Sequence, residues 1–160
     1  MALNASFVLE GPKGTRSVPA GEFFTPPARD PERENQLAPD ELLIEVGVPD
    51  ANGYRSAYDE VRERAAFDWP LVSVAAAVKI TGGAVQDARI VLGAVAPIPW
   101  RVTKAEQALA GKPLDEAAAT AAARAATFGA APLSDNGYKV GLVQTLVRRT
   151  LVSLAERGKA

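Results

Sequence analysis

The side chains that most often carry out chemistry in proteins are scarce in this chain of 160 residues. It contains no histidine and no cysteine. This excludes disulfides, thiol nucleophiles, Cys/His zinc sites, iron–sulfur ligation, haem held by histidine and every catalytic triad that needs histidine. Carboxylates remain as potential metal ligands, but the sequence does not cluster them at ligand spacing. We therefore predict no catalytic residue and no metal-binding residue in this chain.

The most charged segment outside a proline-rich stretch is residues 58–64. On a β-strand, Glu60, Arg62 and Arg64 lie on one face and Asp59 lies on the other. Opposite charges along one face are typical of a solvated strand with salt bridges; the alternative is a polar edge that faces a bound ligand or partner. Paired carboxylates also suit general acid–base catalysis, but the sequence indicates neither a cleft nor a second group.

The sequence lacks the motifs that hold a nucleotide phosphate. The Gly82-Gly83 pair is expected to form a hairpin turn, and neither G-x-G-x-x-G nor G-x-x-x-x-G-K-[ST] occurs. With 18 basic and 19 acidic residues, the net charge of −1 gives no reason to expect a nucleic-acid partner. The alanine-rich stretch of low charge at residues 70–78 is too short to span a bilayer. The first ten residues do not resemble a secretory signal, so we expect no membrane association and a cytoplasmic location, or export alongside a partner.

The first forty residues are expected to form a hairpin and a long loop. Residues 5–19 alternate weakly around a Gly/Pro turn, which predicts the hairpin. Residues 20–39 are rich in proline and charge. A loop of this length is either functional or interfacial, or it is a plain solvated linker.

Four strands and three helices are expected after this loop. The clearest signal is alternation over residues 71–80, a turn at Gly82-Gly83 and a returning strand. Thr103 and Glu106 fit a capping box for a helix that Gly111 ends, and Asn136 is expected to cap the longest helix. Because strands come first and helices last, we predict an α+β fold, an antiparallel sheet with about three C-terminal helices on one face. The remaining predicted elements are strands at 42–48, 54–64 and 85–95 and helices at 115–128 and 136–156.

Two tryptophans stand beside prolines, in the segments 67–70 and 97–101. The simpler interpretation is that they pack the ends of the sheet against the helices. The alternative is that Trp69 or Trp100 anchors an interface.

The ordered set of short motifs resembles the flavoprotein (medium) subunit of molybdenum hydroxylases, the family of xanthine dehydrogenase, carbon monoxide dehydrogenase and aldehyde oxidoreductases. The Pro99-Trp100-Arg101 and Asn136-Gly137-Tyr138-Lys139-Val140 elements are most similar to the bacterial aldehyde oxidoreductase branch. The other matching segments are 11–19, 22–24, 37–43, 48–49, 58–67, 71–75, 92–97, 105–111 and 132–133.

This resemblance implies two regions and a set of cofactor contacts. Residues 1–40 correspond to the tail of the FAD-binding region, and residues 41–160 correspond to a C-terminal domain that covers one side of the flavin. By position, Leu43 matches an apolar residue near the isoalloxazine. Asp59 and Glu60 stand where the family has a polar flavin neighbour that is often lysine.

The resemblance also implies a division of labour among chains. The chain is expected to complete the flavin pocket and to dock to other subunits, with FAD held only together with an N-terminal FAD-binding half or chain. A large subunit with molybdopterin and a small subunit with [2Fe–2S] clusters are the other expected partners. The alternative is a non-catalytic interaction or assembly module, or a truncated relict, with no redox role.

Overall fold

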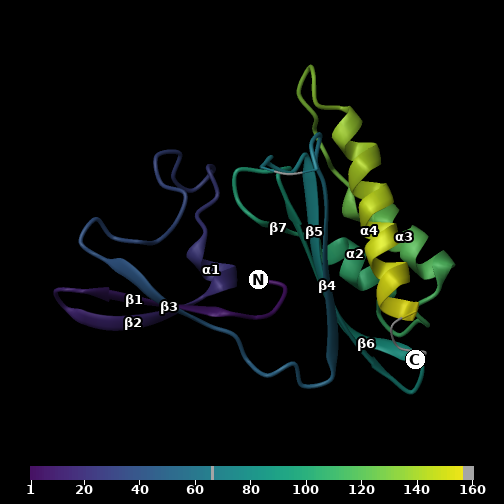
Figure 1. Cartoon of the computed structure of the whole chain (residues 1–160), viewed down its shortest axis with the longest axis horizontal. Helices are drawn as coiled ribbons and strands as arrows, with labels where there is room; N and C mark the ends of the chain where they lie inside the picture. The colour runs from purple at the N-terminus through teal and green to yellow at the C-terminus, as the bar shows by residue number, and fades with distance from the viewer. Residues whose placement is uncertain (66, 157–160) are drawn as a thin grey trace.

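Two antiparallel sheets and a layer of helices make up the computed structural model, which describes residues 1–65 and 67–156 (Figure 1). The strand order is β2-β1-β3 in the first sheet and β4-β5-β6-β7 in the second. The strands are β1 (Ser6–Gly11), β2 (Gly14–Pro19), β3 (Leu42–Gly47), β4 (Tyr54–Val61), β5 (Val72–Thr81), β6 (Ala84–Gly93) and β7 (Trp100–Arg101). The helices are α1 (Ala20–Phe23), α2 (Thr103–Leu109), α3 (Glu116–Ala126) and α4 (Tyr138–Glu156). The predicted α+β class is confirmed.

The first sheet has a small core on one face. Leu9, Val18 and Phe23 are its buried members. Phe23 packs edge to face against Phe7, with ring centroids 4.7 Å apart. Strand β3 pairs antiparallel with β1 and therefore belongs to this sheet, so the predicted boundary at residue 40 separates β3 from its pairing partner.

The second sheet packs one face against α2, α3 and α4 (Figure 1). Alternate residues of β5 point into this core, and Val72, Val74 and Val78 are fully buried, as the period of two predicts. The buried face of α4 is the one that its helical spacing predicts, made of Val143, Leu146, Val147, Thr150, Leu151 and Leu154.

The ends of the elements agree with the sequence signals in part. Gly82 and Gly83 form the predicted two-residue hairpin turn with positive φ angles of 60° and 81°. Gly111 follows α2 with φ of 71°, as expected of a helix stop. The capping box is wrong, because Val102 is the N-cap of α2 without a side-chain cap. The Asn136 cap is wrong too: its side chain accepts a hydrogen bond from the Leu133 N–H, 2.7 Å away.

The second sheet leaves its other face free of helices, and Figure 1 shows this face turned toward the side on which the first sheet lies. Among the described residues, no helix combines the length and the apolar character needed to cross a bilayer.

Candidate functional site

The two carboxylates predicted to approach a cofactor, Asp59 and Glu60, point to opposite faces of β4. Asp59 pairs with the core residue Val74, so its side chain lies on the helix-covered face, where Arg149 of α4 donates to it over 3.4 Å. Glu60 lies on the helix-free face. A ligand on that face therefore meets Glu60, whereas Asp59 links the sheet to α4.

Glu60 is the centre of a small polar cluster on the helix-free face. The Tyr58 hydroxyl donates to its Oε2 over 2.8 Å, and Arg62 Nε lies 3.0 Å from its Oε1. Partial burial, and then the hydrogen bond to the Glu60 carboxylate, raise the pKa of Tyr58 above its ordinary value. Tyr58 is 62% exposed, so its ring offers an aromatic surface beside the carboxylate. The predicted pairing along this face is confirmed for Glu60 and Arg62.

A second cluster lies on the same face, around Tyr54, which precedes Tyr58 on β4. The Tyr54 hydroxyl donates to Asp87 Oδ2 over 2.6 Å and accepts from Arg89 Nη2 over 2.7 Å. The Arg89 guanidinium also stacks 4.3 Å from the Tyr54 ring centroid. The hydrogen bond to Asp87 is the main cause that raises the pKa of Tyr54. Strong mutual bonding fixes these three side chains as a rigid rim.

Small residues form the floor between the two clusters. Ala75 and Ala77 of β5 lie opposite Tyr58 and Ser56 of β4, and Ser73 lies opposite Glu60. A Cβ atom added at Gly93 would collide with Ser73 Oγ. Ser73 and Ala77 are nevertheless buried, so neighbouring groups already cover them, and Ala75 is the partly exposed one of the three.

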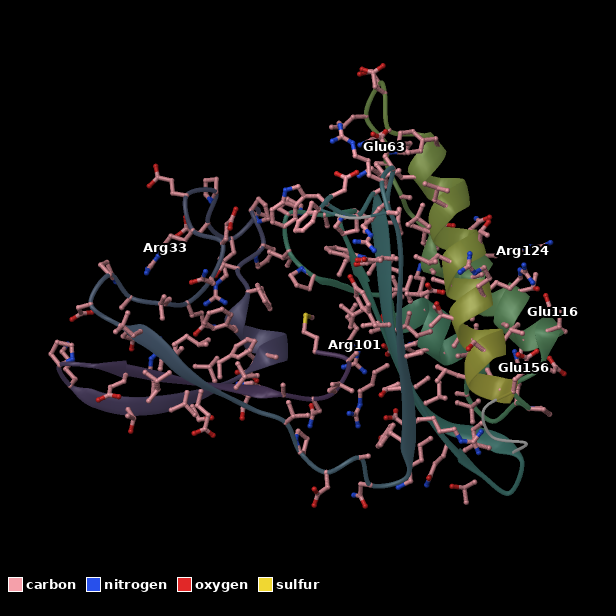
Figure 2. The ribbon with its side chains drawn as sticks, in the orientation of Figure 1. Arg33, Glu63, Arg101, Glu116, Arg124 and Glu156 are labelled. Carbon is pink, nitrogen blue, oxygen red and sulfur yellow. The ribbon has the colours of Figure 1, made fainter. Side chains whose placement is uncertain are left out.

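Positive charge gathers at the β7 side of this face. Figure 2 shows Arg101 on the side of the second sheet away from α4. Its guanidinium is held by Glu106, with Nε 2.9 Å from Oε1. Burial, followed by the charges of Arg101 and Arg89, lowers the pKa of the Met1 amine. Arg89 is likewise paired, with its Nε 3.4 Å from Asp87 Oδ2, so each of the two guanidiniums already faces a carboxylate.

Leu43, the predicted apolar contact, stands on β3 of the first sheet. It pairs with the buried Leu9 but is itself 41% exposed. The structure thus places Leu43 and Glu60 on different sheets and brings no direct contact between them. Their expected roles toward a cofactor stay predictions.

The aromatic residues of the β4–β5 connection are fully open to solvent. Phe67 and Trp69 are 105% and 89% exposed. Both oxygens of Asp68 accept backbone N–H groups, from Arg64 and Trp69, which fixes the loop. The predicted packing of Trp69 against the helices is wrong, because the loop turns this indole into solvent. Exposed aromatic side chains of this size are typical of interface anchors.

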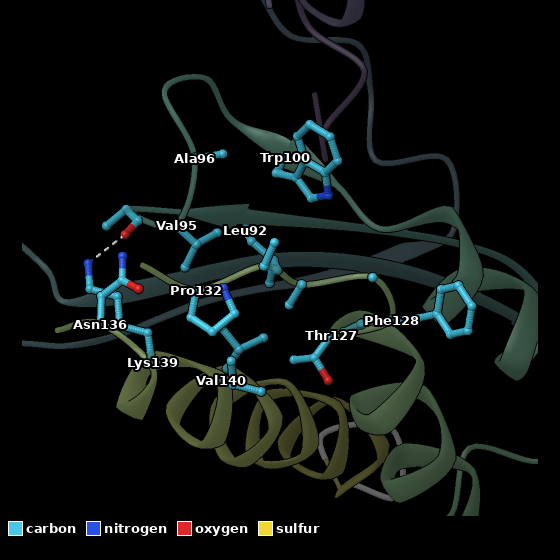
Figure 3. Close-up of a pocket in the computed structure, with 16 residues that line it drawn as sticks. Leu92, Val95, Ala96, Trp100, Thr127, Phe128, Pro132, Asn136, Lys139 and Val140 are labelled. Carbon is cyan, nitrogen blue, oxygen red and sulfur yellow. Dashed lines mark hydrogen bonds between the residues drawn. The ribbon is translucent and has the colours of Figure 1, made fainter. Parts of the chain in front are cut away.

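A pocket of about 510 Å³ lies on the helix-covered side, between the β6–β7 connection and the α3–α4 connection (Figure 3). Its described lining is mostly apolar, and its polar end carries Asn136 and Lys139. Lys139 Nζ donates to the Ala94 carbonyl over 2.9 Å, the dashed line in Figure 3. Trp100, 51% exposed, stands at its rim.

Sequence reasoning missed this pocket. Two sequence features contribute to its lining, Trp100 beside two prolines and the Asn136–Lys139 segment. Nothing in the sequence indicates that these two features lie next to each other. The positive φ of 60° at Ala94, which bends the chain around the pocket, has no signal in an alanine.

The described residues limit what these surfaces can do. No group of three or more acidic side chains among them could hold a metal ion. The helix-free face offers the exposed Tyr58 ring and charged side chains that pair with one another. Such a face can bind a planar ligand or a partner.

Three comparisons with known proteins agree on what the chain is similar to. Residues 56–154 match the model of the CO dehydrogenase flavoprotein C-terminal domain. The aldehyde oxidoreductase FAD-binding subunit PaoB of Escherichia coli K12 is 34% identical over 93% of the chain and 43% of its own length. The structure of carbon monoxide dehydrogenase from Hydrogenophaga pseudoflava lacking the Mo-pyranopterin moiety superposes with a TM-score of 0.85 at 35% identity, over 98% of this chain and 54% of that one. Quinoline 2-oxidoreductase from Pseudomonas putida 86 gives a TM-score of 0.84 at 30% identity, over 97% and 53%.

The chain spans about half the length of the curated relatives it matches, from 39% to 54%. The match begins in the first sheet and runs through the second sheet and the helices, because it covers nearly all of this chain.

Proposed function

Because the chain belongs to the CO dehydrogenase flavoprotein C-terminal domain family, we propose that it works as the C-terminal part of the FAD-binding medium subunit of a molybdenum-containing hydroxylase. In this role it completes the flavin pocket and docks to the other subunits. The observation that carries the proposal is the match of nearly this whole chain to about half of a solved one, with a TM-score of 0.85 over 98% of this chain and 54% of the other at 35% identity. A bound flavin would accept electrons and pass them on.

The helix-free face fits one wall of a flavin pocket. A planar ring system can stack on the exposed Tyr58 ring, beside the partly exposed Ala75. The sequence holds no glycine-rich phosphate loop, so the pyrophosphate needs another region of protein.

This wall alone is expected to have a low affinity for FAD. One wall without a phosphate clamp provides few of the contacts that a dinucleotide needs, so the purified chain alone is expected to be folded, colourless and unable to retain FAD.

The exposed aromatics support the docking part of the proposal. Phe67 and Trp69 occupy one short loop and are almost wholly exposed. Partners of the kind expected are an FAD-binding portion, a molybdopterin subunit and a [2Fe–2S] subunit, and a cytoplasmic location remains our expectation.

Glu60 and Asp59 are adjacent in sequence but lie on opposite faces of β4, so substituting each of them gives a matched test of the proposed flavin wall. In the purified assembly, we expect Glu60→Gln to raise the flavin reduction potential by about 30 mV or more, about 1.4 kcal/mol for a two-electron couple. The reason is that the Glu60 carboxylate opposes the negative charge that reduction places on a flavin. Asp59→Asn is the control, because Asp59 points toward Arg149 on the other face. Equal shifts in both variants, or none in Glu60→Gln, would contradict the proposed wall.

A further inference from the structure

We propose that the pocket between the β6–β7 connection and the α3–α4 connection binds a small organic acid, with its carboxylate at Lys139 and Asn136 and its apolar body against the inner wall (Figure 3). This inference goes beyond the proposed function, because it requires neither a flavin nor a partner subunit. It assigns a ligand to the helix-covered side of the second sheet.

The pocket has the size and the inner wall of a small-molecule site. Its volume is about 510 Å³, and ligand pockets usually measure about 300–1,000 Å³. Leu92, Ala126 and Val143 line it, and all three are buried members of the core of the second sheet. The apolar body of a ligand in this pocket therefore contacts the hydrophobic core.

Two aromatic side chains line the pocket and are still open to solvent. Trp100 and Phe128 are 51% and 72% exposed. Lys104 Nζ lies 3.1 Å from the Phe128 ring centroid, so a cation–π contact helps to fix this ring. A ligand that covers part of both rings removes apolar surface from water, which favours binding.

Two hydrogen-bond donors lie at the end of the pocket away from Phe128, where Figure 3 shows Asn136 and Lys139. Asn136 Oδ1 accepts from the Leu133 N–H over 2.7 Å, which leaves the two N–H groups of its Nδ2 for a ligand. Lys139 Nζ uses one of its three donors on the Ala94 carbonyl, 2.9 Å away. A carboxylate has two acceptor oxygens and therefore matches this pair of donors.

The charges around these donors favour an anionic head group. Among the described residues, none that lines the pocket is acidic. The ion pairs of the described part of the chain do not include Lys139. Asp135 precedes Asn136 but does not line the pocket, and it accepts from the Ser134 hydroxyl over 3.0 Å. Lys139 therefore offers its positive charge to a ligand.

The backbone of the pocket wall is strained beside Lys139. Ala94 lines the pocket with a φ of 60°, a left-handed conformation that favours glycine. Its carbonyl is the one that accepts from Lys139. Strain of this kind persists where the surrounding contacts fix it, and it clusters at ligand sites.

The full chain with a single tryptophan tests the binding directly. The sequence has two tryptophans, and Trp69 is 89% exposed, so Trp69→Phe leaves Trp100 as the reporter without removing packing. The probe is 4-phenylbutyrate at pH 7, and the neutral 4-phenylbutanol is the comparison. We expect the acid to shift Trp100 emission to shorter wavelength in a saturable way, and to bind at least about tenfold more tightly than the alcohol.

A matched pair of lysine variants in the same background tests the head-group contact. Lys139→Met keeps an apolar stem and removes the charge, so we expect at least about tenfold weaker binding of the acid and less than about a twofold change for the alcohol. Lys112→Met is the control, because Lys112 Nζ also donates to a backbone carbonyl, that of Ala108 over 2.9 Å, but does not line the pocket. Circular dichroism checks that each variant is folded.

Amide NMR spectra of the unsubstituted chain give a second readout. We expect 4-phenylbutyrate to move the amide resonances of residues 94–96 and 127–131 most, because these segments line the pocket. Largest shifts at Tyr58 and Glu60 instead would place the acid on the helix-free face and overturn the inference.

Three other results would also overturn the site: no saturable binding of the acid, equal affinity for acid and alcohol, or unchanged acid affinity in Lys139→Met. The peptide acetyl-Gly-Gly-Leu, with a free terminal carboxylate, is measured alongside. Tighter binding of this peptide than of 4-phenylbutyrate would overturn the small acid in favour of a partner's chain terminus. Because no flavin is present in these measurements, their outcome does not depend on the proposed function.

Discussion

Replacing Glu106 tests what stabilises the β7 side of the helix-free face, because its carboxylate accepts hydrogen bonds from both the Ile90 backbone and the Arg101 side chain. Its Oε1 accepts from the Ile90 N–H over 2.9 Å and from Arg101 Nε over 2.9 Å, and its Oε2 accepts from Arg101 Nη2 over 3.1 Å. Ile90 is fully buried, so Glu106→Ala leaves a buried N–H without a partner, at about 1–3 kcal/mol. The lost ion pair to the half-exposed Arg101 adds at most about 1 kcal/mol.

We therefore expect Glu106→Ala to lower the free energy of unfolding by about 1–4 kcal/mol, measured by urea denaturation followed by circular dichroism. Glu106→Gln keeps an acceptor for Ile90 and is expected to lose only about 0.5–1.5 kcal/mol. Glu156→Ala, at an exposed position of α4, is the control and should stay within about 0.5 kcal/mol of the parent. Equal losses in the alanine and glutamine variants would refute the reasoning, because they would show that the Ile90 bond contributes nothing.

Four further predictions concern other parts of the structure. Thr103→Ala should change the unfolding free energy by less than about 0.5 kcal/mol, since Val102 is the N-cap; a loss near 1 kcal/mol in urea denaturation would instead support the capping box. Gly83→Ala should destabilise by about 1 kcal/mol or more in the same assay, because φ is 81° there, and an unchanged midpoint would contradict that turn. Leu151→Ala should cost about 2–5 kcal/mol by thermal or urea unfolding, since this side chain is fully buried between α4 and the second sheet, and a loss below 1 kcal/mol would argue against that packing. The Arg16 hydrogen bond, and then the Ala38 N–H, lower the pKa of Glu41 from 4.5 to about 2. The stability from this carboxylate is therefore present above pH 4.5 and lost as the pH falls toward 2; the NMR shift of the Ala38 amide should titrate near 2, and a midpoint near 4.5 would refute the contact.

The sequence allowed the second sheet and α4 to be predicted because each repeats one period over many residues. Val72, Val74 and Val78 alternate over a strand, and Leu151 belongs to a helical stripe that is buried throughout. The helix caps were harder to predict. Thr103 and Asn136 have side chains that suit an N-cap, but tertiary contacts decide which groups these side chains hydrogen-bond. The pairing of β3 with β1 could not be predicted either, because a short apolar strand does not indicate which other strand it pairs with.

The sequence predicted which face of β4 each charged residue occupies but, beyond Glu60 and Arg62, not how the side chains of the candidate site pair. The alternation of β4 separates Asp59 from Glu60, and this much follows from a period of two. That Arg149 binds Asp59 across 90 positions of sequence, and that Tyr54, Asp87 and Arg89 form a rim, depends on pairings that only the folded chain shows. The exposure of Trp69 depends likewise on how its loop turns.

The most direct test of the central claim is native purification of the tagged chain, followed by a visible spectrum, metal analysis and mass spectrometry of its partners. The account predicts flavin absorption, molybdenum and a co-purifying FAD-binding polypeptide. A colourless chain without molybdenum and without these partners would contradict it, and would leave an interaction module that keeps the family fold without a redox role.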